Sequence, residues 1–342
     1  MFHWTVDKSA QILLIGTVSA LIGLIIGTIS AYCGFCLFLL LWGTGSGYYV
    51  VRAMQQISPI GKAVLVTGCD TGIGNQLALH LDKLGFRVFA GCLFANKGGE
   101  GATKLKENGS KKLHVIQLDV TSDEELQEAR ETIEKILPEN ECFWGVVNNA
   151  GLSTFGNLEW VPLSTVKRIA DVNVFGMISV IKTFLPLIRK SKGRIVNSSS
   201  TLGRISAPMR SSYVASKFAV EGLSDCLRSE MKPLGIDVCI IEPGNFCAAT
   251  GIFTPDSVEK IAENMWETMS EETQELCGKE TYRNSVEIMK TFIVGGNTDV
   301  MPVLISMEEA LTQKYPQPRY QSMDGLYKAR IFVGTPLPGV GT

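Results

Sequence analysis

The chain has few histidines, and its cysteines do not form the pattern of a disulfide framework. Its 342 residues include only three histidines, His3, His80 and His114, which lie far apart in the sequence. The nine cysteines are an odd number and are scattered, which favours reduced thiols. Cys33 and Cys36 form one C-x-x-C pair, but its neighbours are apolar. We therefore expect no metal site and no histidine-based catalytic triad.

The sequence also lacks an excess of charge of either sign. It has 32 Lys and Arg against 34 Asp and Glu, a net charge of -2 and a pI near 6.0. A balance of this kind gives no reason to expect nucleic acid as a partner. Internal repeats and low-complexity tracts are absent from the sequence as well, and the length suits one large or two small domains.

Charged residues are missing altogether between Lys8 and Arg52. A transmembrane helix needs about 20 consecutive apolar residues. Residues 12–29 nearly satisfy this once, and 35–51 could form a second pass, with a turn at 30–34. One long tilted helix is the alternative. Either arrangement predicts membrane lipid as a partner.

The apolar segment differs from the sorting signals that are removed from a mature chain. A signal peptide has a much shorter apolar core, and a mitochondrial transit peptide is rich in Arg and Ser. We therefore expect residues 1–57 to form a retained membrane anchor and residues 58–342 to form the catalytic domain. The few flanking charges leave the orientation open between the two sides of the membrane.

After the anchor, short apolar runs alternate with amphipathic helical patterns. Runs that are apolar on both sides are typical of strands in a buried parallel sheet. Their alternation with helices predicts an α/β fold, a Rossmann-like doubly wound parallel sheet with helices on both faces. The predicted strands are Ala63–Thr67, Arg87–Ala90, Leu113–Leu118, Trp144–Asn148, Arg194–Asn197 and Ile236–Glu242, with a last short one near 319–320.

A glycine-rich turn follows the first predicted strand, and a helical pattern at Leu77, Leu81 and Leu84 follows the turn. Strand, glycine turn and helix form the context of a dinucleotide-binding site. The glycines let the backbone approach a pyrophosphate, and the helix N-terminus faces the anion. The predicted cofactor-binding residues of this turn are Thr67, Gly68, Asp70, Gly72, Ile73 and Gly74.

A second cluster joins a tyrosine, a lysine and a serine. Tyr213 and Lys217 are four residues apart and share one face of a helix. A nearby cation favours the phenolate, so that the phenol can take or give a proton. Ser200 lies thirteen residues upstream at the end of a predicted strand, and a loop can bring its hydroxyl to the phenol. Taken alone, a Tyr-x-x-x-Lys pair is typical of an ordinary helix surface, and a run of serines is typical of a loop.

Together with the segments 118–120, 148–151 and 243–244, these motifs resemble the short-chain dehydrogenase/reductase family, from about Gly61 to Tyr320. The resemblance implies that Tyr213 is the proton donor or acceptor. It implies that Lys217 lowers the pKa of this tyrosine and holds the nicotinamide ribose, and that Ser200 binds the substrate oxygen. It also implies that Asn173 orients a bound water and that Asp119 binds the adenine. The residues implied to line the cofactor pocket by backbone contact are Asn148, Asn149, Ala150 and Gly151, and those implied to contact the nicotinamide end are Pro243, Gly244 and Thr250.

The cofactor preference is predicted from the end of the second strand. Many NAD enzymes place an acid there for the ribose 2′-hydroxyl. Residues 91–93 contain neither such an acid nor an arginine for a 2′-phosphate. Asp70 in the glycine turn would repel an additional phosphate. We therefore expect NAD rather than NADP.

Details around the motifs resemble one branch of the family, the D-β-hydroxybutyrate dehydrogenases, and the membrane-bound 17β-hydroxysteroid and retinol dehydrogenases share much of the pattern. The first branch implies the mitochondrial inner membrane, and the others the endoplasmic reticulum. A hydroxy acid needs a cation for its carboxylate, and we expect Arg210 to supply it, with Arg204 as second candidate. A hydrophobic alcohol needs no such charge.

Two further expectations concern the surroundings of the site. Residues 245–300 are predicted to form a substrate lid with an amphipathic helix at 256–266. The family resemblance implies a homo-oligomer formed through the helices at 173–188 and 213–232. A hypothesis of a different class is a membrane-tethered scaffold that senses NAD without turnover, against which the complete set of Ser200, Tyr213 and Lys217 speaks.

Overall fold

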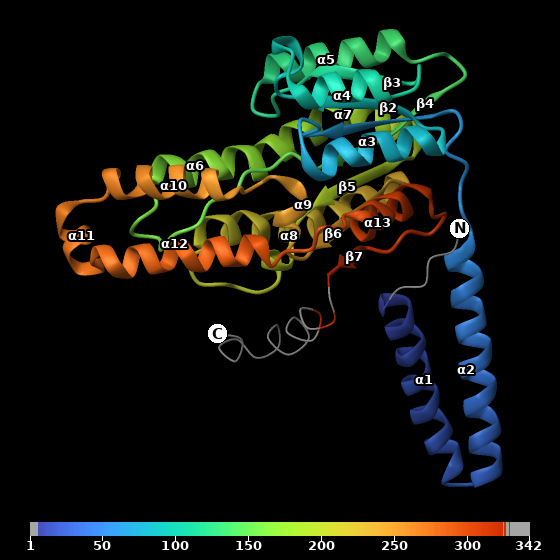
Figure 1. Cartoon of the computed structure of the whole chain (residues 1–342). Coiled ribbons are helices and arrows are strands. Elements are labelled where there is room, and N and C mark those ends of the chain that lie inside the picture. Colours follow the sequence, from blue (N-terminus) through green and yellow to red (C-terminus); the bar gives the residue numbers. More distant parts are fainter. Residues whose placement is uncertain (1–5, 324, 326–327, 329–342) are drawn as a thin grey trace. The chain divides into compact units, whose positions relative to one another are not determined.

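The computed structural model describes residues 6–323, 325 and 328, and the chain divides into two compact units (Figure 1). The first consists of Met1–Ser58 and Thr312–Gln317, and the second of Pro59–Leu311 and Pro318–Thr342.

Unit one contains two helices, α1 (Val6–Gly27) and α2 (Ala31–Met54), joined by a short turn at 28–30. The helices pack closely because glycines face each other. A Cβ atom on Gly34 would lie 2.4 Å from the carbonyl oxygen of Gly23. Small residues allow such close approach between membrane helices. Apolar side chains point outward, as in Leu24 and Ile25, which are each 68% exposed.

The N-terminal segment forms two helices rather than one long helix. Both Lys8–Gly27 and Ala31–Met54 are long and apolar enough to span a membrane. Ser30 lies in the turn and caps α2 by accepting a hydrogen bond from the amide of Cys33. The expectation that Gly34 belongs to the turn was wrong, because this residue lies inside α2 at the closest approach of the helices.

Among the described residues, a third helical stretch, Leu163–Ser191, also has the length and hydropathy of a membrane span. It differs from the first two because 44% of it is buried inside the structure, against 11% and 6%. Its apolar side chains, including Val180 and Phe184, belong to the hydrophobic core of the second unit. Burial against protein therefore accounts for its composition.

Unit two is built on a parallel sheet of seven strands in the order β3-β2-β1-β4-β5-β6-β7 (Figure 1). This confirms the predicted fold class, and each observed strand overlaps a predicted one. The strands are β1 (Lys62–Thr67), β2 (Arg87–Cys92), β3 (Leu113–Gln117), β4 (Cys142–Asn148), β5 (Arg194–Ser198), β6 (Asp237–Pro243) and β7 (Arg319–Ser322).

Helices cover the sheet. Side chains alternate between the two faces of a strand, so that Leu65 and Val66 of β1 point to opposite sides. Leu65 belongs to the large core cluster, in which α5, α7 and α8 pack against the sheet. The helices are α3 (Gly72–Leu84), α4 (Glu100–Asn108), α5 (Asp123–Ile136), α6 (Leu163–Ala170), α7 (Met177–Ser191), α8 (Ser211–Met231) and α13 (Met301–Thr312), with a π-helical turn η2 (Asp171–Gly176) and 3-10 turns η1 (Ala95–Lys97), η3 (Thr201–Gly203) and η4 (Lys232–Leu234).

A separate helical layer, which we call the helical cover, contains α9 (Cys247–Thr250), α10 (Pro255–Thr268), α11 (Glu271–Cys277) and α12 (Lys279–Val294). The helix expected at 256–266 is α10, which begins at a capping box formed by Thr254 and Ser257. Helices α10 and α12 lie side by side (Figure 1). They share a second hydrophobic core, to which Met265 and Met289 contribute.

Candidate active site

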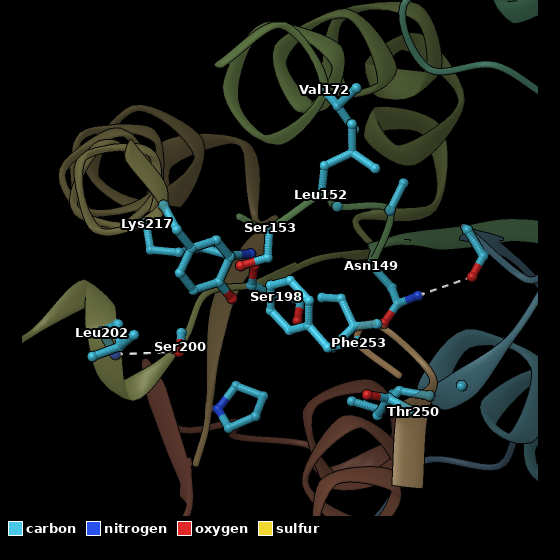
Figure 2. A pocket seen from close by; sticks show the side chains of 18 of the residues that line it. Asn149, Leu152, Ser153, Val172, Ser198, Ser200, Leu202, Lys217, Thr250 and Phe253 are labelled. Atoms are coloured by element: carbon cyan, nitrogen blue, oxygen red, sulfur yellow. Dashed lines mark hydrogen bonds between the residues drawn. The ribbon is translucent and has the colours of Figure 1, made fainter. Parts of the chain in front are cut away.

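A cavity of about 1230 Å³ opens at the carboxyl ends of the strands. In a parallel α/β sheet this is the edge where ligands bind. Its wall combines loops that follow β1, β2, β3, β4, β5 and β6 with residues of α8, α9 and α12. Figure 2 shows part of this wall, with Lys217 and Ser200 on one side and Asn149 and Thr250 on the other.

The glycine turn after β1 forms a cradle that side chains would fill. Gly68 and Gly72 have positive φ angles of 70° and 59°, which favour glycine. A Cβ atom on Gly68 would lie 2.7 Å from Ala150 Cα, and one on Gly74 would lie 2.3 Å from the carbonyl oxygen of Gly68. The turn leads directly into the N-terminus of α3. These features fit the pyrophosphate of a dinucleotide.

Asp70 brings a carboxylate to the end of β2. Its two oxygens accept hydrogen bonds from the backbone amides of Leu93 at 2.8 Å and Phe94 at 3.0 Å. Asp70 and Asp119 both line the cavity. The Oδ1 atom of Asp119 also accepts from the amide and hydroxyl of Thr121 at 2.9 and 2.7 Å. The acid that β2 itself lacks is therefore supplied in space by the glycine turn.

Some predicted cofactor residues lie behind the cavity wall. The described lining includes Asn149, Ala150 and Gly151, but it includes neither Asn148 nor Thr67. Asn148 is buried, and its Nδ2 donates to Asn197 Oδ1 at 2.8 Å. The Asn148 side chain thus joins β4 to β5 behind the wall, and the contact of its backbone with the cofactor stays a prediction.

Thr67 and Gly74 shape the cavity from beneath. The Thr67 hydroxyl accepts hydrogen bonds from the amides of Asn149 at 3.1 Å and Ala150 at 3.0 Å. It thereby fixes the loop after β4 against the end of β1. Gly74 lies outside the described lining and packs against Gly68 and Asn149. The structure thus gives both residues a supporting position rather than a place in the wall.

Ser200, Tyr213 and Lys217 all line the cavity, as do Ile73, Pro243, Gly244 and Thr250. Helix α8 carries the tyrosine and the lysine, and Ser200 precedes the turn η3. The Lys217 Nζ atom donates to the carbonyl oxygen of Ser198 at 2.8 Å and lies 5.6 Å from the centre of the Tyr213 ring. The structure therefore brings together two hydroxyls and an ammonium, as the sequence predicts.

Burial dominates the ionisation of these groups. It raises the pKa of Tyr213, and the positive charge of Arg210 and a hydrogen bond with Ser200 oppose the rise. It lowers the pKa of Lys217 to about 8, against the charge of Glu221, which raises it. Arg210 is the cation that opposes this rise in the Tyr213 pKa, and the effect of Lys217 on the phenol stays a prediction.

Asn173 occupies the π-helical turn η2 between α6 and α7. Its Oδ1 accepts from the Leu152 amide at 2.7 Å, and its Nδ2 donates to the Leu152 carbonyl at 2.9 Å and to Ser216 Oγ at 3.0 Å. Short π-helical turns are frequent at functional sites. Asn173 is 3% exposed and absent from the described lining. It joins the loop after β4 to the residue that precedes Lys217.

Arg210 lies inside the cavity and contacts its aromatic wall. The guanidinium lies 5.2 Å from the ring centre of Tyr213, 5.3 Å from that of Phe253 and 5.9 Å from that of Phe292. One Nη atom donates to the Ser153 hydroxyl at 3.0 Å. The structure thus brings a cation and the tyrosine to one point of the wall.

Arg204 is directed elsewhere. Its Nη1 lies 3.1 Å from Oε1 of Glu242, a carboxylate that is fully buried, and Arg204 is absent from the described lining of the cavity. The second candidate for a carboxylate site is therefore not in a position to act as one. Its ion pair with a buried acid explains why this arginine stays close to the end of β6.

Sequence reasoning missed the apolar wall that the helical cover contributes. Ile288, Met289 and Phe292 of α12 line the cavity together with Phe253. Their spacing of three and four residues places them on one face of a helix, and this pattern was a signal available in the sequence. These residues lie inside the lid predicted at 245–300, but the prediction singled out only the helix at 256–266.

The fold and this site agree with comparisons to known proteins. Residues 62–257 match the short chain dehydrogenase family, so the chain belongs to this family and is an oxidoreductase. It is 46% identical to the mitochondrial D-beta-hydroxybutyrate dehydrogenase of Rattus norvegicus over 280 residues, which cover 82% of each chain.

Two other similar proteins have names that give substrates other than hydroxybutyrate. Identity is 39% to estradiol 17-beta-dehydrogenase 2 of Rattus norvegicus, with 84% of this chain and 73% of that one covered. It is 38% to retinol dehydrogenase 7 of Mus musculus, with 79% and 84% covered. Among solved structures, a short chain dehydrogenase/reductase from Burkholderia phymatum in complex with NAD has a TM-score of 0.67 at 18% identity and covers 81% of this chain and 93% of its own, which shows the fold alone.

Proposed function

We propose that the protein interconverts (R)-3-hydroxybutyrate and acetoacetate with NAD as cofactor. The observation that carries this proposal is Arg210, a guanidinium inside the cavity and 5.2 Å from the ring centre of Tyr213. Arginine binds carboxylates through two parallel hydrogen bonds. A short hydroxy acid can place its carboxylate on Arg210 while its hydroxyl faces Tyr213. The identity of 46% to a D-beta-hydroxybutyrate dehydrogenase supports the same substrate.

In this mechanism the chain binds the substrate and moves a proton. Ser200 orients the substrate oxygen by a hydrogen bond, and Tyr213 takes the hydroxyl proton during oxidation or returns it during reduction. Lys217 holds the ribose of the cofactor and keeps a positive charge near the phenol. The bound nicotinamide supplies the hydride chemistry. Asn173 holds the loop after β4 and the start of α8 in register through Leu152 and Ser216.

Asp70 supports NAD as the preferred form of the cofactor. Its carboxylate lies at the end of β2, fixed by two backbone amides, and lines the cavity. A carboxylate at this place accepts a hydrogen bond from a ribose 2′-hydroxyl and repels a 2′-phosphate. Asp119 at the end of β3 would contact the adenine side. The glycine cradle and the N-terminus of α3 would hold the pyrophosphate.

The test is a comparison of substrates on one preparation of the full chain. Reduction of NAD is measured with (R)-3-hydroxybutyrate, (S)-3-hydroxybutyrate, estradiol and retinol, and the panel is repeated with NADP. The proposal requires the highest kcat/KM for (R)-3-hydroxybutyrate with NAD. Turnover of estradiol or retinol without turnover of either hydroxybutyrate would overturn it.

A hydrophobic alcohol is the second candidate substrate, because the cavity has an apolar side. Phe253, Ile288 and Phe292 line it, and a steroid or retinoid would pack against such residues. Estradiol and retinol dehydrogenases at 39% and 38% identity support this alternative. The hypothesis of a scaffold without turnover is set aside, since relatives at 44–46% identity over most of the chain are enzymes.

We further propose that α1 and α2 anchor the protein in the mitochondrial inner membrane or the endoplasmic reticulum. The full chain should stay in the membrane pellet after washing with alkaline carbonate, and a shortened variant that begins at Ser58 should be released. Since two passes return the chain to the side where it started, tags at both ends should be equally accessible to protease. Protection of one tag only would contradict the two-pass anchor.

We also propose that the protein assembles as a homo-oligomer through the segments 173–188 and 213–232. Phe175 and Phe218 in these segments are 60% and 45% exposed, and large apolar side chains gain free energy when a second copy covers them. Light scattering in detergent should give at least twice the mass of one chain. A monomeric mass for an active preparation would contradict the proposal.

A further inference from the structure

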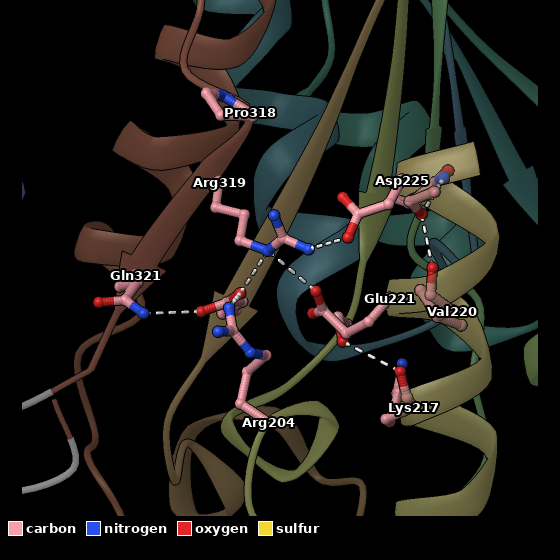
Figure 3. Close-up of polar contacts among 12 residues, drawn as sticks. Arg204, Lys217, Val220, Glu221, Asp225, Pro318, Arg319 and Gln321 are labelled. Atoms are coloured by element: carbon pink, nitrogen blue, oxygen red, sulfur yellow. Dashed lines mark hydrogen bonds and ion pairs between the residues drawn. The ribbon is translucent and has the colours of Figure 1, made fainter. Parts of the chain in front are cut away.

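A pair of buried glutamates lies outside the described lining of the cavity. Figure 3 shows one of them, Glu221, facing Arg319. Glu242 at the end of β6 is fully buried, and Glu221 is 6% exposed. Glu221 belongs to α8 and lies four residues after Lys217, on the same face of the helix. The catalytic lysine and a buried acid are thus neighbours on one helix.

Arginines from distant parts of the sequence hold this acid pair. The Nε atom of Arg319 on β7 lies 3.1 Å from Oε2 of Glu221 and 3.2 Å from Oε1 of Glu242. Arg204 approaches Glu242 at 3.1 Å, and Gln321 of β7 donates to the same carboxylate at 2.9 Å. Each of the two carboxylates therefore has at least one guanidinium within ion-pair distance.

Burying two like charges side by side is costly unless cations compensate them. Here burial raises the pKa of Glu221, and the charge of Glu242 adds to the rise, while Arg319 opposes it. The effect of the acid pair on the site goes through Lys217, whose pKa burial lowers and the charge of Glu221 raises.

We propose that Glu221, held by Arg319 of the last strand one helical turn from Lys217, is a positioning residue that keeps the Lys217 ammonium charged from behind the site. Without a buried negative charge on this side, the lysine would lose its proton more readily on desolvation. The ion pair with β7 fixes the carboxylate where it acts. This inference rests on the proposed role of Lys217.

The charged and titratable groups around this pair come from every element packed there. They are Tyr213, Lys217, Asp225 and Arg228 on α8, Glu242 on β6, Arg319 on β7 and Arg204 after η3. Asp225 offers a matched control, because it also pairs with Arg319. Its side chain is 45% exposed and one turn further from Lys217, and it does not contribute to the pKa of the lysine.

The experiment measures kcat/KM for 3-hydroxybutyrate and NAD against pH in the full chain, for wild type, Glu221→Gln and Asp225→Asn. Both variants remove one partner of Arg319, but only the first removes the charge beside Lys217. In Glu221→Gln we expect the alkaline limit of activity to move down by about one pH unit. Asp225→Asn should keep the wild-type profile, and Glu221→Asp should restore most of it.

A second variant covers the case in which Glu221→Gln does not fold. Arg319→Met leaves Glu221 in place but removes the cation that holds it ionised, so the alkaline limit should move in the same direction by a smaller amount. A merely structural role would lower the unfolding temperature of these variants and leave the pH profile of the folded fraction unchanged. An unchanged profile in every variant that folds would overturn the inference.

Lys217→Met separates the failure of this inference from a failure of the proposed function. If Lys217→Met is inactive and Glu221→Gln has the wild-type profile, only the positioning role of Glu221 is wrong. If Lys217→Met keeps wild-type turnover, the proposed mechanism itself is wrong.

Discussion

The sheet edge and the helical cover face each other across the cavity and are built from different side chains. The core beneath the sheet contains mostly β-branched and aliphatic residues such as Val146, Ile195 and Val220. The core of the cover contains methionines and aromatic residues, among them Met265, Met289 and Tyr282. Methionine adapts its shape to what it packs against, whereas branched side chains have few rotamers. The sheet edge is therefore suited to holding side chains in a fixed geometry, and the helical cover is suited to adapting its shape to a bound molecule.

This difference separates two tasks. The residues proposed to move the proton, Ser200, Tyr213 and Lys217, come from the sheet edge and α8. The apolar residues that would contact the rest of a substrate, Met289 and Phe292, come from α12 of the cover. Relatives with the same sheet edge and different named substrates are expected if the cover selects the substrate. The following changes test each side separately.

Tyr213→Phe should have the largest effect, because it removes the proton carrier of the sheet edge and leaves the ring. General acid–base catalysis contributes about 10²–10⁴-fold, and we expect a loss of at least this size in kcat with every substrate. Binding of NAD, measured by the change in protein fluorescence, should remain. Near-normal turnover in this variant would show that the proton follows another route.

Arg210→Met should lower kcat/KM for 3-hydroxybutyrate by about ten- to a hundredfold, since hydrogen bonds to charged groups contribute about 1.5–3 kcal/mol. An uncharged alcohol of similar size should be oxidised as well as before or better. Arg210→Lys should recover only part, because an ammonium lacks the planar fork. Equal losses with charged and uncharged substrates would mean that Arg210 acts on Tyr213 rather than on a carboxylate.

Asp70→Asn should change the choice between cofactors and leave the choice between substrates alone. The amide keeps the size of the side chain and removes the charge that would repel a 2′-phosphate. We expect the ratio of kcat/KM with NADP to that with NAD to rise by about tenfold, which corresponds to about 1.4 kcal/mol. The ranking of hydroxybutyrate and estradiol with NAD serves as the control and should be unchanged.

Tyr282→Phe should have the smallest effect and should be confined to the helical cover. The hydroxyl donates to the carbonyl of Ala262 at 2.6 Å and joins α12 to α10. Losing it costs about 0.5–1.5 kcal/mol, so amide hydrogen exchange in α10 and α12 should accelerate about two- to tenfold. Exchange in α8 should stay at the wild-type rate, and faster exchange there would mean that cover and sheet edge open together.

The parts of the molecule that sequence predicts well are those with a local signal. The strands follow from short apolar runs, and the glycine turn from residues that allow positive φ and close approach, as Gly68 and Gly72 do. Strand ends shifted by one or two residues, since neighbouring strands extend β2 to Cys92 and β4 to Cys142. The place of Gly34 inside α2 was not predicted, because only the partner helix requires a glycine there.

Side-chain partners far apart in the sequence could not be predicted in the same way. Nothing near Arg204 indicates that it pairs with Glu242, or that Arg319 lies between two acids on other elements. Asn148 carries the expected motif but is used between strands. Burial raises the pKa of Tyr213 and lowers that of Lys217, and burial depends on the whole fold rather than on the local motif.

The last strand, β7, also has a consequence for the order in which the protein matures during synthesis. A ribosome makes α8 and β6 well before it makes β7, since residue 319 follows Glu221 by almost a hundred positions. Until Arg319 arrives, Glu221 lacks the guanidinium that pairs with it and Glu242 lacks one of its two, so burying the acids together would be unfavourable. The surroundings of Lys217 are therefore complete only near the end of translation, when β7 adds its arginine to the sheet.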